Sequence, residues 1–347
     1  MFVARDLRAG YDRQVIVNQL PGSRVPYFMK SGHGPRSLFA GHVVTRLARA
    51  EDTGGLFDAA IWAAGRGAEL PLHRHTKSNQ AVMVLAGQLD LNLEGRTYRL
   101  GPFDFASIPA GTLHGHRAHG HHTRFLEWTT GGDGGKLPEA LGVITEFCGI
   151  PAEIEALTAN QQVCAASLDT AFENGAASDA PHVSTVPPAG ATPYILESGE
   201  GERLIAGDQQ FTFLAHQGNT GGEFISLTTR GPKGDRIPRH FHEKHTECFF
   251  CLEGAMTMWA FDEEIALGPG DFLHVPAGTI HAYRLDAPSN NFMGILAPGL
   301  FEPFFRALCD PYPGYDFPAK PWPFRFDRVI AKLPELDLRL VEGPPQR

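Results

Sequence analysis

The sequence contains little cysteine, fewer basic than acidic residues, and no long apolar run. Five cysteines in 347 residues are too few for a disulfide framework in a chain of this length. The 30 lysines and arginines are outnumbered by 39 aspartates and glutamates, so the formal net charge is −9. A nucleic-acid-binding protein needs a basic face, so that class is excluded. No apolar stretch approaches the roughly 18 residues of a membrane-spanning helix, which predicts no membrane partner.

The first residues and the cysteines indicate a reducing compartment. Residues 1–14 (MFVARDLRAGYDRQ) lack the apolar core of a secretory signal, so we expect a cytoplasmic protein with reduced thiols. Cys248 and Cys251 form a CxxC pattern, but they lie in the apolar run CFFCL. That run is typical of a buried strand, so we interpret both cysteines as structural.

Glycine, proline and histidine are abundant, with 39, 27 and 16 residues. Much glycine and proline without low complexity indicates tight turns between short strands. Residues 88–93 (QLDLNL) alternate between polar and apolar, which predicts a strand with one buried face. We therefore predict an all-β fold of the sandwich or jelly-roll type.

Two segments of the chain repeat each other at an offset of 167 residues. Residues 73–114 and 240–281 align without a gap, and 15 of the 42 positions are identical. The identities include a His-x-His pair, Leu-Gly-Pro, Pro-Ala-Gly-Thr and a final histidine. The chain is therefore predicted to contain two copies of one domain, as two barrels in tandem.

Composition predicts the boundaries of these domains. Residues 151–172 are rich in Ala, Glu, Leu and Gln and begin with Pro and acidic residues, which predicts one or two helices. We expect an N-terminal domain at 1–172 that includes this helical segment, a linker at 173–193, and a C-terminal domain at 194–347. The last domain carries an aromatic tail at 298–323, which we expect to pack over the second barrel or over a partner subunit.

Three histidines and a glutamate of the second copy have the spacing of a metal site. His240 and His242 lie two residues apart, so on a strand they point to the same face. Glu247 follows five residues later, and His281 arrives from a neighbouring strand after a Pro-Ala-Gly turn. Three imidazoles and a carboxylate suit a divalent transition metal and leave open positions for a substrate and dioxygen.

These residues carry a family resemblance. The pattern HxH(x4)E(x6)G followed by PxGxxH resembles the paired motifs of the cupin superfamily, and two such domains make a bicupin. Residues 247–284 and 298–305, with Pro26-Tyr-Phe and Gly32 near the start, resemble the quercetin 2,3-dioxygenase (quercetinase) type. The resemblance implies that Glu247 is catalytic, accepting the proton of a flavonol 3-hydroxyl as well as contacting the metal.

The first copy departs from this pattern at one position. His73, His75 and His114 are in place, but Gln80 stands where Glu247 stands in the second copy. Glutamine is a poor metal ligand and cannot act as a general base. The first barrel then either binds metal and leaves deprotonation to it, or is a metal-poor structural copy, or acts on a substrate that needs no base. We favour the second interpretation.

Further side chains near the motif are candidates for a substrate pocket. Tyr283 lies two residues after a ligand position, so it points to the same face, and Phe249 and Met258 supply apolar bulk. His245 and His274 lie near the motif and are interpreted mainly as structural, with a role behind the ligands as the alternative. The other histidines of the run 114–122 are interpreted as loop or strand-edge residues.

The leading hypothesis, which the resemblance implies, is a metal-dependent dioxygenase that cleaves a flavonol-like or other aromatic or enolic substrate with O2 and releases carbon monoxide. It requires one or two divalent transition metal ions, for which Fe²⁺ is preferred over Mn, Co, Ni, Cu or Zn. The alternatives are a bicupin enzyme for another small substrate, of the oxalate decarboxylase, 1,3-diketone dioxygenase or isomerase type, and a non-catalytic binding or storage module. A monomer and a homodimer both stay open.

Overall fold

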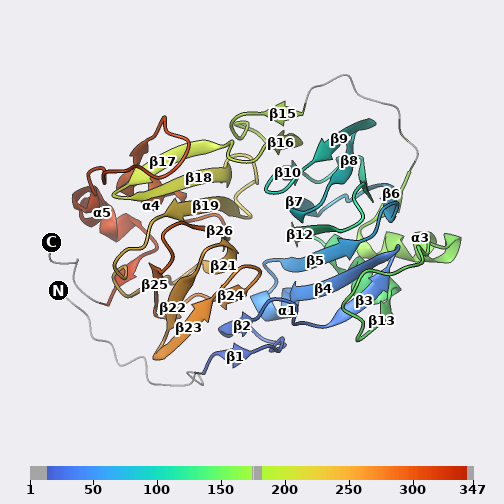
Figure 1. Ribbon diagram of the computed structural model, residues 1–347, viewed down its shortest axis with the longest axis horizontal. Helices are drawn as coiled ribbons and strands as arrows, with labels where there is room; N and C mark the ends of the chain where they lie inside the picture. The colour runs from blue at the N-terminus through green and yellow to red at the C-terminus, as the bar shows by residue number, and fades with distance from the viewer. Residues whose placement is uncertain (1–13, 174, 176–181, 342–347) are drawn as a thin grey trace.

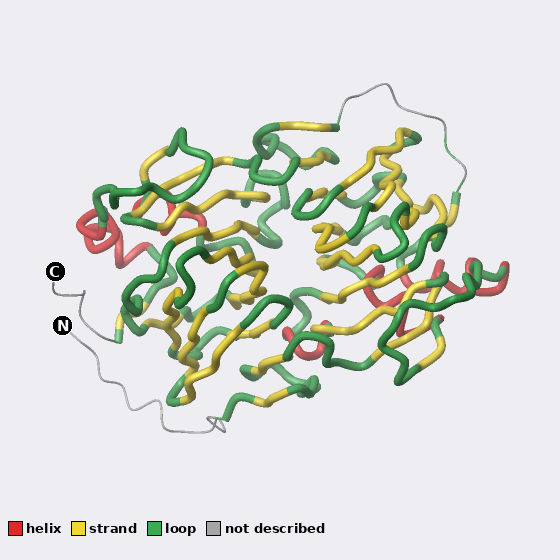
Figure 2. The backbone as a smooth tube through the Cα atoms, viewed as in Figure 1, coloured by secondary structure: helices red, strands yellow, loops and turns green. Residues whose placement is uncertain are grey.

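The computed structural model describes residues 14–173, 175 and 182–341 as two β barrels lying side by side (Figure 1). Strands dominate both barrels, and the helices are short (Figure 2). The prediction of an all-β fold with two barrels is therefore confirmed. Among the described residues, no helix is both long enough and apolar enough to cross a membrane.

Two sheets form the first barrel. The larger runs in the order β13 (Val143–Ile144), β3 (Arg36–Phe39), β4 (His42–Ala48), β5 (Asp58–Ala64), β12 (Thr123–Thr130), β7 (Asn79–Ala86), β10 (Phe105–Ile108), β16 (Tyr194–Leu196) and β15 (Val183–Ser184). The smaller runs β14 (Ala171–Phe172), β6 (Glu69–Arg74), β11 (His114–Ala118), β8 (Leu89–Leu93) and β9 (Arg96–Leu100). The alternating run at 88–93 lies in β8, whose three leucines are buried.

The second barrel repeats this plan. Its larger sheet runs in the order β1 (Ile16–Val17), β2 (Tyr27–Met29), β24 (Phe272–Val275), β21 (Thr246–Glu253), β26 (Asn290–Ala297), β19 (Ile225–Gly231), β18 (Gln209–Ala215), β17 (Glu202–Ala206) and β27 (Asp310–Pro311). Its smaller sheet runs β23 (Glu263–Leu267), β22 (Met256–Ala260), β25 (His281–Leu285), β20 (His240–Phe241) and β28 (Arg339–Leu340). Cys248 and Cys251 are buried in β21 as free thiols, which confirms their predicted structural role.

Each barrel takes strands from the other half of the chain. In β2, Tyr27 pairs with His274 of the second barrel, and in β16, Tyr194 pairs with Ser107 of the first. The sheets thus differ from the predicted division at residues 173–193, of which 174 and 176–181 lie outside the described residues. Local composition does not reveal this exchange, because an edge strand pairs with any extended segment beside it.

An apolar core lies between the two barrels. It combines large side chains of the first barrel, such as Phe105 and Trp128, with Phe250 and Phe272 of the second. Tyr27 reaches from the exchanged strand into this core and donates its hydroxyl to the carbonyl of Leu47 at 3.0 Å. Because buried apolar area contributes about 25 cal/mol per Å², this shared core stabilises the two barrels against each other.

The helical segment is shorter than predicted. Of residues 151–172, α3 (Ala159–Ala165) and the 3-10 turn η2 (Ala166–Leu168) are helical, while 151–158 are irregular. The helix begins after Thr158, which forms a capping box with Gln161, so this cap and not Pro151 sets the boundary. The other helical elements of the first half are α1 (Ala50–Thr53), η1 (Gly134–Lys136) and α2 (Leu137–Leu141).

The aromatic tail packs on the second barrel. It forms α4 (Glu302–Leu308), and α5 (Phe326–Lys332) with the 3-10 turn η3 (Leu333–Glu335) follows it. The Phe305 ring of α4 packs against Phe211 and Phe213 of β18, with ring centres 5.4 and 5.5 Å apart. The tail therefore covers one wall of the second barrel, the first of the two placements expected from the sequence.

Candidate metal centre

Three histidines and a glutamate converge inside the second barrel. His240 of β20 and His281 of β25 are cross-strand partners, and Glu247 lies on β21 of the other sheet. One ligand atom from each of these residues and from His242 lies within 4.8 Å of the others. The structure thus brings together the four residues that the sequence singles out.

Backbone carbonyls orient all three imidazoles in the same way. The Nδ1 atoms of His240, His242 and His281 lie 2.9, 2.6 and 3.0 Å from the carbonyl oxygens of Pro238, Asp337 and Thr279, respectively. Because a carbonyl only accepts, each ring donates its Nδ1–H and keeps the proton off Nε2. The three Nε2 lone pairs are then available at the centre, as metal ligation requires.

Burial and mutual proximity set the charges of this cluster. Burial lowers the pKa of His240 to about 3 and that of His242 well below its usual value, so both rings are neutral near pH 7. Burial opposes ionisation of Glu247, but the surrounding His242, His245 and His281 hold the pKa of its carboxyl well below the usual value. Neutral imidazoles and an ionised carboxylate are the forms that bind a metal ion.

The donor set fits a divalent metal ion. The buried Nε2 of His242 has no hydrogen-bond partner among the described residues, which is costly for a polar atom unless an ion or a solvent molecule satisfies it. Three imidazole nitrogens and one carboxylate oxygen suit divalent transition metals, with bonds of about 2.0–2.2 Å. The cluster therefore combines the chemistry and the geometry of a metal centre.

A buried histidine–aspartate pair lies behind Glu247. The Nδ1 of His245 is 2.8 Å from Oδ2 of Asp337, and its Nε2 is 3.5 Å from Oε1 of Glu247. Asp337 also accepts the backbone N–H groups of residues 243–245. Despite burial, which favours a neutral ring, the two carboxylates raise the pKa of His245. The sequence analysis did not single out Asp337. The signal is present, because the dipeptide Leu336-Asp337 follows the second copy as Leu168-Asp169 follows the first.

Asp337→Asn is expected to weaken the second centre. The substitution keeps the shape but removes the charge that holds His245 against Glu247, and the loss of such a supporting partner typically costs about 10–100-fold in metal affinity. Metal affinity measured by competition with a chelator checks this. Asp169→Asn, the matched change in the first barrel, should leave the second centre's affinity as in the parent. Equal affinities of the Asp337→Asn and parent proteins would contradict the role.

The first barrel repeats the histidines without the carboxylate. One ligand atom from each of His73, His75 and His114 lies within 4.8 Å of the others. Their Nδ1 atoms lie 2.8, 3.0 and 2.9 Å from the carbonyl oxygens of Pro71, Asp169 and Thr112, respectively. Gln80 is buried on β7, and Ser78 stands where the second barrel has His245. The first barrel thus lacks both the carboxylate and the imidazole behind it.

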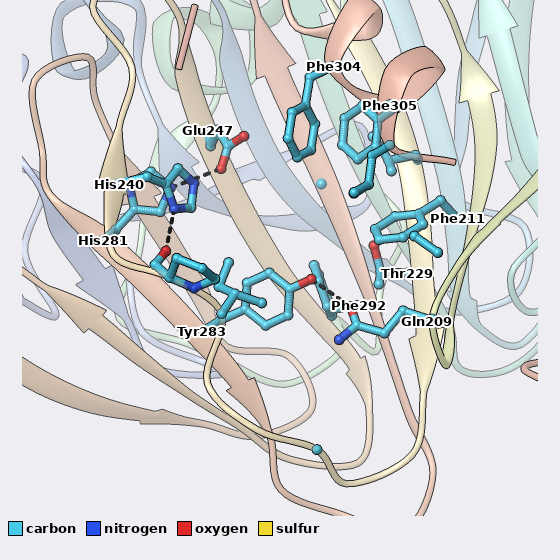
Figure 3. Close-up of a pocket in the computed structure, with 18 of the residues that line it drawn as sticks. Gln209, Phe211, Thr229, His240, Glu247, His281, Tyr283, Phe292, Phe304 and Phe305 are labelled. Carbon is cyan, nitrogen blue, oxygen red and sulfur yellow. Dashed lines mark hydrogen bonds and ion pairs between the residues drawn. The ribbon is translucent and has the colours of Figure 1, made fainter. Parts of the chain in front are cut away.

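A cavity of about 360 Å³ adjoins Glu247 and His281 in the second barrel (Figure 3). Tyr283 and Phe249 line it, as predicted for the substrate pocket, but Met258 does not: its fully buried side chain belongs to the barrel core. The sequence did not single out the aromatic residues that complete the lining. These are Phe211 and Phe292 of the barrel and Phe304, Phe305, Phe324 and Phe326 of the C-terminal segment.

Tyr283 is tied to the cavity wall. Its hydroxyl donates to Oε1 of Gln209 at 2.6 Å, and Figure 3 shows this bond at the side of the cavity away from Glu247. Burial raises the pKa of Tyr283 far above its usual value, so the phenol stays neutral. Tyr283 therefore offers a ring surface and a bound hydroxyl, not a base, to a ligand.

Two other histidines have structural surroundings. The interpretation of His116 as a loop or strand-edge residue is wrong. His116 lies within β11, and its ring is buried because it packs against Trp62 and Phe125. His274 lies between the barrels, where its ring stacks on Tyr27 at 4.8 Å between centres. Neither belongs to the two histidine clusters.

A glutamate is buried inside the first barrel. Glu127 of β12 is 5% exposed, and one of its carboxylate oxygens has no hydrogen-bond partner among the described residues. Burial raises the pKa of Glu127 from 4.5 to about 7, with Arg46 acting in the opposite direction. Because folding raises the pKa of Glu127, the protein keeps its full stability below pH 4.5, where this carboxyl is protonated in both the folded and the unfolded states. That stability is lost progressively as the pH rises through about 7.

Glu127→Gln is therefore expected to stabilise the metal-free protein at pH 8 and to have a much smaller effect on its stability at pH 5. A shift from 4.5 to about 7 corresponds to roughly 3 kcal/mol between these limits. Unfolding free energies of the parent and the variant at both pH values measure the difference. A gain of the same size at pH 5 and pH 8 would show that ionisation of Glu127 is not the cause.

The two barrels define the class of protein. Residues 61–128 and 227–290 match the Cupin domain family. Among solved structures, oxalate decarboxylase of Lactobacillus farciminis in complex with formate shares the fold with a TM-score of 0.53 at 12% identity, over 78% of this chain and 86% of that chain. Oxalate decarboxylase of Bacillus subtilis at pH 4.6 has a TM-score of 0.51 at 15% identity, over 80% and 77%. The protein is a bicupin.

Relatives of similar sequence indicate which family of bicupins the chain belongs to. The chain is 44% identical over 335 residues to quercetin 2,3-dioxygenase of Bacillus subtilis, covering 95% of this chain and 99% of the relative. It is 28% identical over 124 residues to quercetin 2,3-dioxygenase of Aspergillus japonicus, covering 33% and 35%. The chain belongs to the quercetin 2,3-dioxygenase family.

Proposed function

We propose that this bicupin is a dioxygenase that cleaves a flavonol-like aromatic enol with O2 and releases carbon monoxide, and that the reaction takes place in the second barrel. The observation that supports this assignment is the junction of Glu247 and His281 with an apolar, aromatic-lined cavity, in a chain of this family. A cavity of about 360 Å³ lies within the usual range of small-molecule sites, about 300–1,000 Å³.

In this proposal, His240, His242, Glu247 and His281 hold one divalent transition metal ion, for which we favour Fe²⁺. When bound, the ion supplies a Lewis acid and a redox partner for substrate and O2. The imidazole orientations are fixed by backbone carbonyls before any metal binds, so little reorganisation is required of the protein.

Glu247 acts as the base toward the substrate. Its carboxylate is ionised, is one of the residues that line the cavity, and lies within reach of a hydroxyl on a ligand in that space. Nε2 of His245 lies 3.5 Å from Oε1, and Oε2 lies 3.2 Å from Nε2 of His281, so both carboxylate oxygens face the imidazoles of the centre. A proton taken from the substrate hydroxyl would be held on this carboxylate.

The aromatic walls bind and enclose the substrate. Phe292 lies on one side, and Phe304 and Phe305 of α4 face it across the cavity (Figure 3). Phe249 also lines the cavity. Flat apolar rings favour a planar aromatic ligand and exclude water from the reacting centre. A small dicarboxylate such as oxalate would gain little from these walls.

Oxygen consumption tests the function. The protein is loaded separately with Fe²⁺, Mn²⁺, Co²⁺ or Ni²⁺ and mixed with a flavonol, and O2 uptake and carbon monoxide are measured. We expect stoichiometric uptake and CO release with at least one metal, and none with oxalate. Metal-loaded protein that consumes no O2 with any flavonol or other enolic substrate would overturn the assignment.

A further inference from the structure

The 167-residue offset extends beyond the motifs into the strands that form the barrel interiors. In the first barrel, Phe125 pairs with Trp62 across β12 and β5. In the second, Phe292 pairs with Thr229 across β26 and β19. Each residue of the second pair is 167 positions after its counterpart, so the two interiors can be compared residue by residue.

The comparison shows bulky residues in the first barrel at positions that line the cavity of the second. Trp62 stands at the position of Thr229, and Glu127 at that of Gly294. Thr229 and Gly294 both line the 360 Å³ cavity, whereas Trp62 and Glu127 are 2% and 5% exposed. An indole and a carboxylate thus lie in the first barrel at the two positions whose small side chains leave space in the second.

Trp62 is part of a packed cluster of four rings. It stacks on Phe125 at 5.7 Å with an interplanar angle of 13°, and it meets His42 and His116 edge-on at 5.3 and 5.5 Å between centres. His42 and His116 also contact each other at 5.2 Å. The counterparts of these two histidines are Gln209 and Tyr283, which line the second cavity.

The histidine cluster beside this packed interior retains its ligand geometry. The buried Nε2 atoms of His73 and His114 have no hydrogen-bond partner within the described part of the chain. Their Nδ1–H groups donate to backbone carbonyls as in the second barrel, so each unpartnered Nε2 carries a free lone pair. One ligand atom of each of the three histidines lies within 4.8 Å of the others, as a shared ion requires. Three neutral imidazoles suit Zn, Cu, Fe or Ni, and Gln80 adds no charge. This geometry favours a first barrel that binds metal over the metal-poor copy preferred from the sequence.

We propose that the two barrels have separate roles: the first holds a closed metal centre on His73, His75 and His114 that admits no aromatic substrate, and substrate binds only in the second. The statement about the second barrel rests on the proposed function, whereas the closure of the first rests on its own packing. The first centre then stabilises the barrel by linking β6 to β11, and it takes no part in turnover.

Cobalt and a flavonol, used without O2, test this division in the intact protein. Wild-type protein is expected to bind two equivalents of Co²⁺ and one of flavonol per chain. Two equivalents of flavonol, or a single equivalent of cobalt, would overturn the proposal. A protein that binds two cobalt ions but no flavonol would contradict the proposed function while supporting closure of the first centre.

Variants with one centre each locate the flavonol. His240→Ala leaves only the first centre, and we expect flavonol to leave its Co²⁺ absorption spectrum unchanged. His73→Ala leaves only the second, whose spectrum we expect to change. A flavonol-dependent spectrum in His240→Ala would overturn the proposal. The wild-type stoichiometry decides the question even where a variant does not fold.

Thr229→Trp provides a matched test of the closing residue. It places in the second barrel the side chain that fills the first, and it leaves all histidines in place. We expect it to retain two cobalt ions and to lose flavonol binding completely. Flavonol bound by a folded Thr229→Trp protein with both cobalt ions would show that an indole at this position does not close a barrel, and it would overturn the proposal.

Discussion

Glu247→Gln is expected to lower the turnover of a flavonol by about 10²–10⁴-fold, the usual contribution of a general base. Gln keeps the size of the side chain and its place on β21, but it cannot accept a proton. The carboxylate is ionised and buried among His242, His245 and His281. The other acids that line the cavity, Asp208 and Asp235, do not belong to this histidine cluster. Initial rates of O2 consumption on fully metal-loaded protein measure the effect.

The chain offers a natural control for this substitution. Gln80 already occupies the corresponding position of the first barrel, where the three histidines keep their geometry. Glu247→Gln should therefore retain the metal of the second centre, with lower affinity, and Gln80→Glu should leave turnover at the parent rate. A Glu247→Gln protein that binds metal and turns over flavonol at the parent rate would exclude Glu247 as the base.

His281→Ala is expected to empty the second centre and to abolish turnover. Loss of a supporting residue already costs about 10–100-fold in metal affinity, and loss of a ligand costs more. The Nε2 of His281 also lies 3.2 Å from the carboxylate oxygen Oε2 of Glu247, so the substitution removes this neighbour as well. Elemental analysis after dialysis, together with O2 consumption, measures both consequences.

His114→Ala is the matched change in the first barrel, since both histidines occupy the same place in the repeat and both donate Nδ1–H to a threonine carbonyl. It should remove the metal of the first centre and leave flavonol turnover near the parent value. If His114→Ala abolishes turnover and His281→Ala does not, the roles of the two barrels are reversed.

Periodicity and spacing were sufficient to predict the repeated barrel and the convergence of the four ligand candidates. The repeated motif fixes the side chains on neighbouring strands, so His240 and His281 become cross-strand partners. Tyr283 follows from the same alternation, because it lies two residues beyond His281 on β25. These features depend on local rules that each strand obeys independently.

Features formed by distant segments were not predictable in the same way. Asp337 reaches His245 from 92 residues away, and the strand exchange joins Tyr27 to His274. Met258 was assigned to the pocket from its apolar character, but apolar character does not distinguish a cavity wall from a barrel core. The helix at 159–165 begins eight residues later than predicted from Pro151, because the capping box at Thr158 determines where it starts.

Anomalous diffraction from metal-loaded crystals tests the central claim most directly. We predict a peak in the second barrel about 2.0–2.2 Å from the Nε2 atoms of His240, His242 and His281 and from an oxygen of Glu247. With flavonol added under exclusion of O2, density for the ligand should appear beside that peak. Active crystals in which the second barrel shows no anomalous peak, with metal and ligand both in the first, would contradict the account.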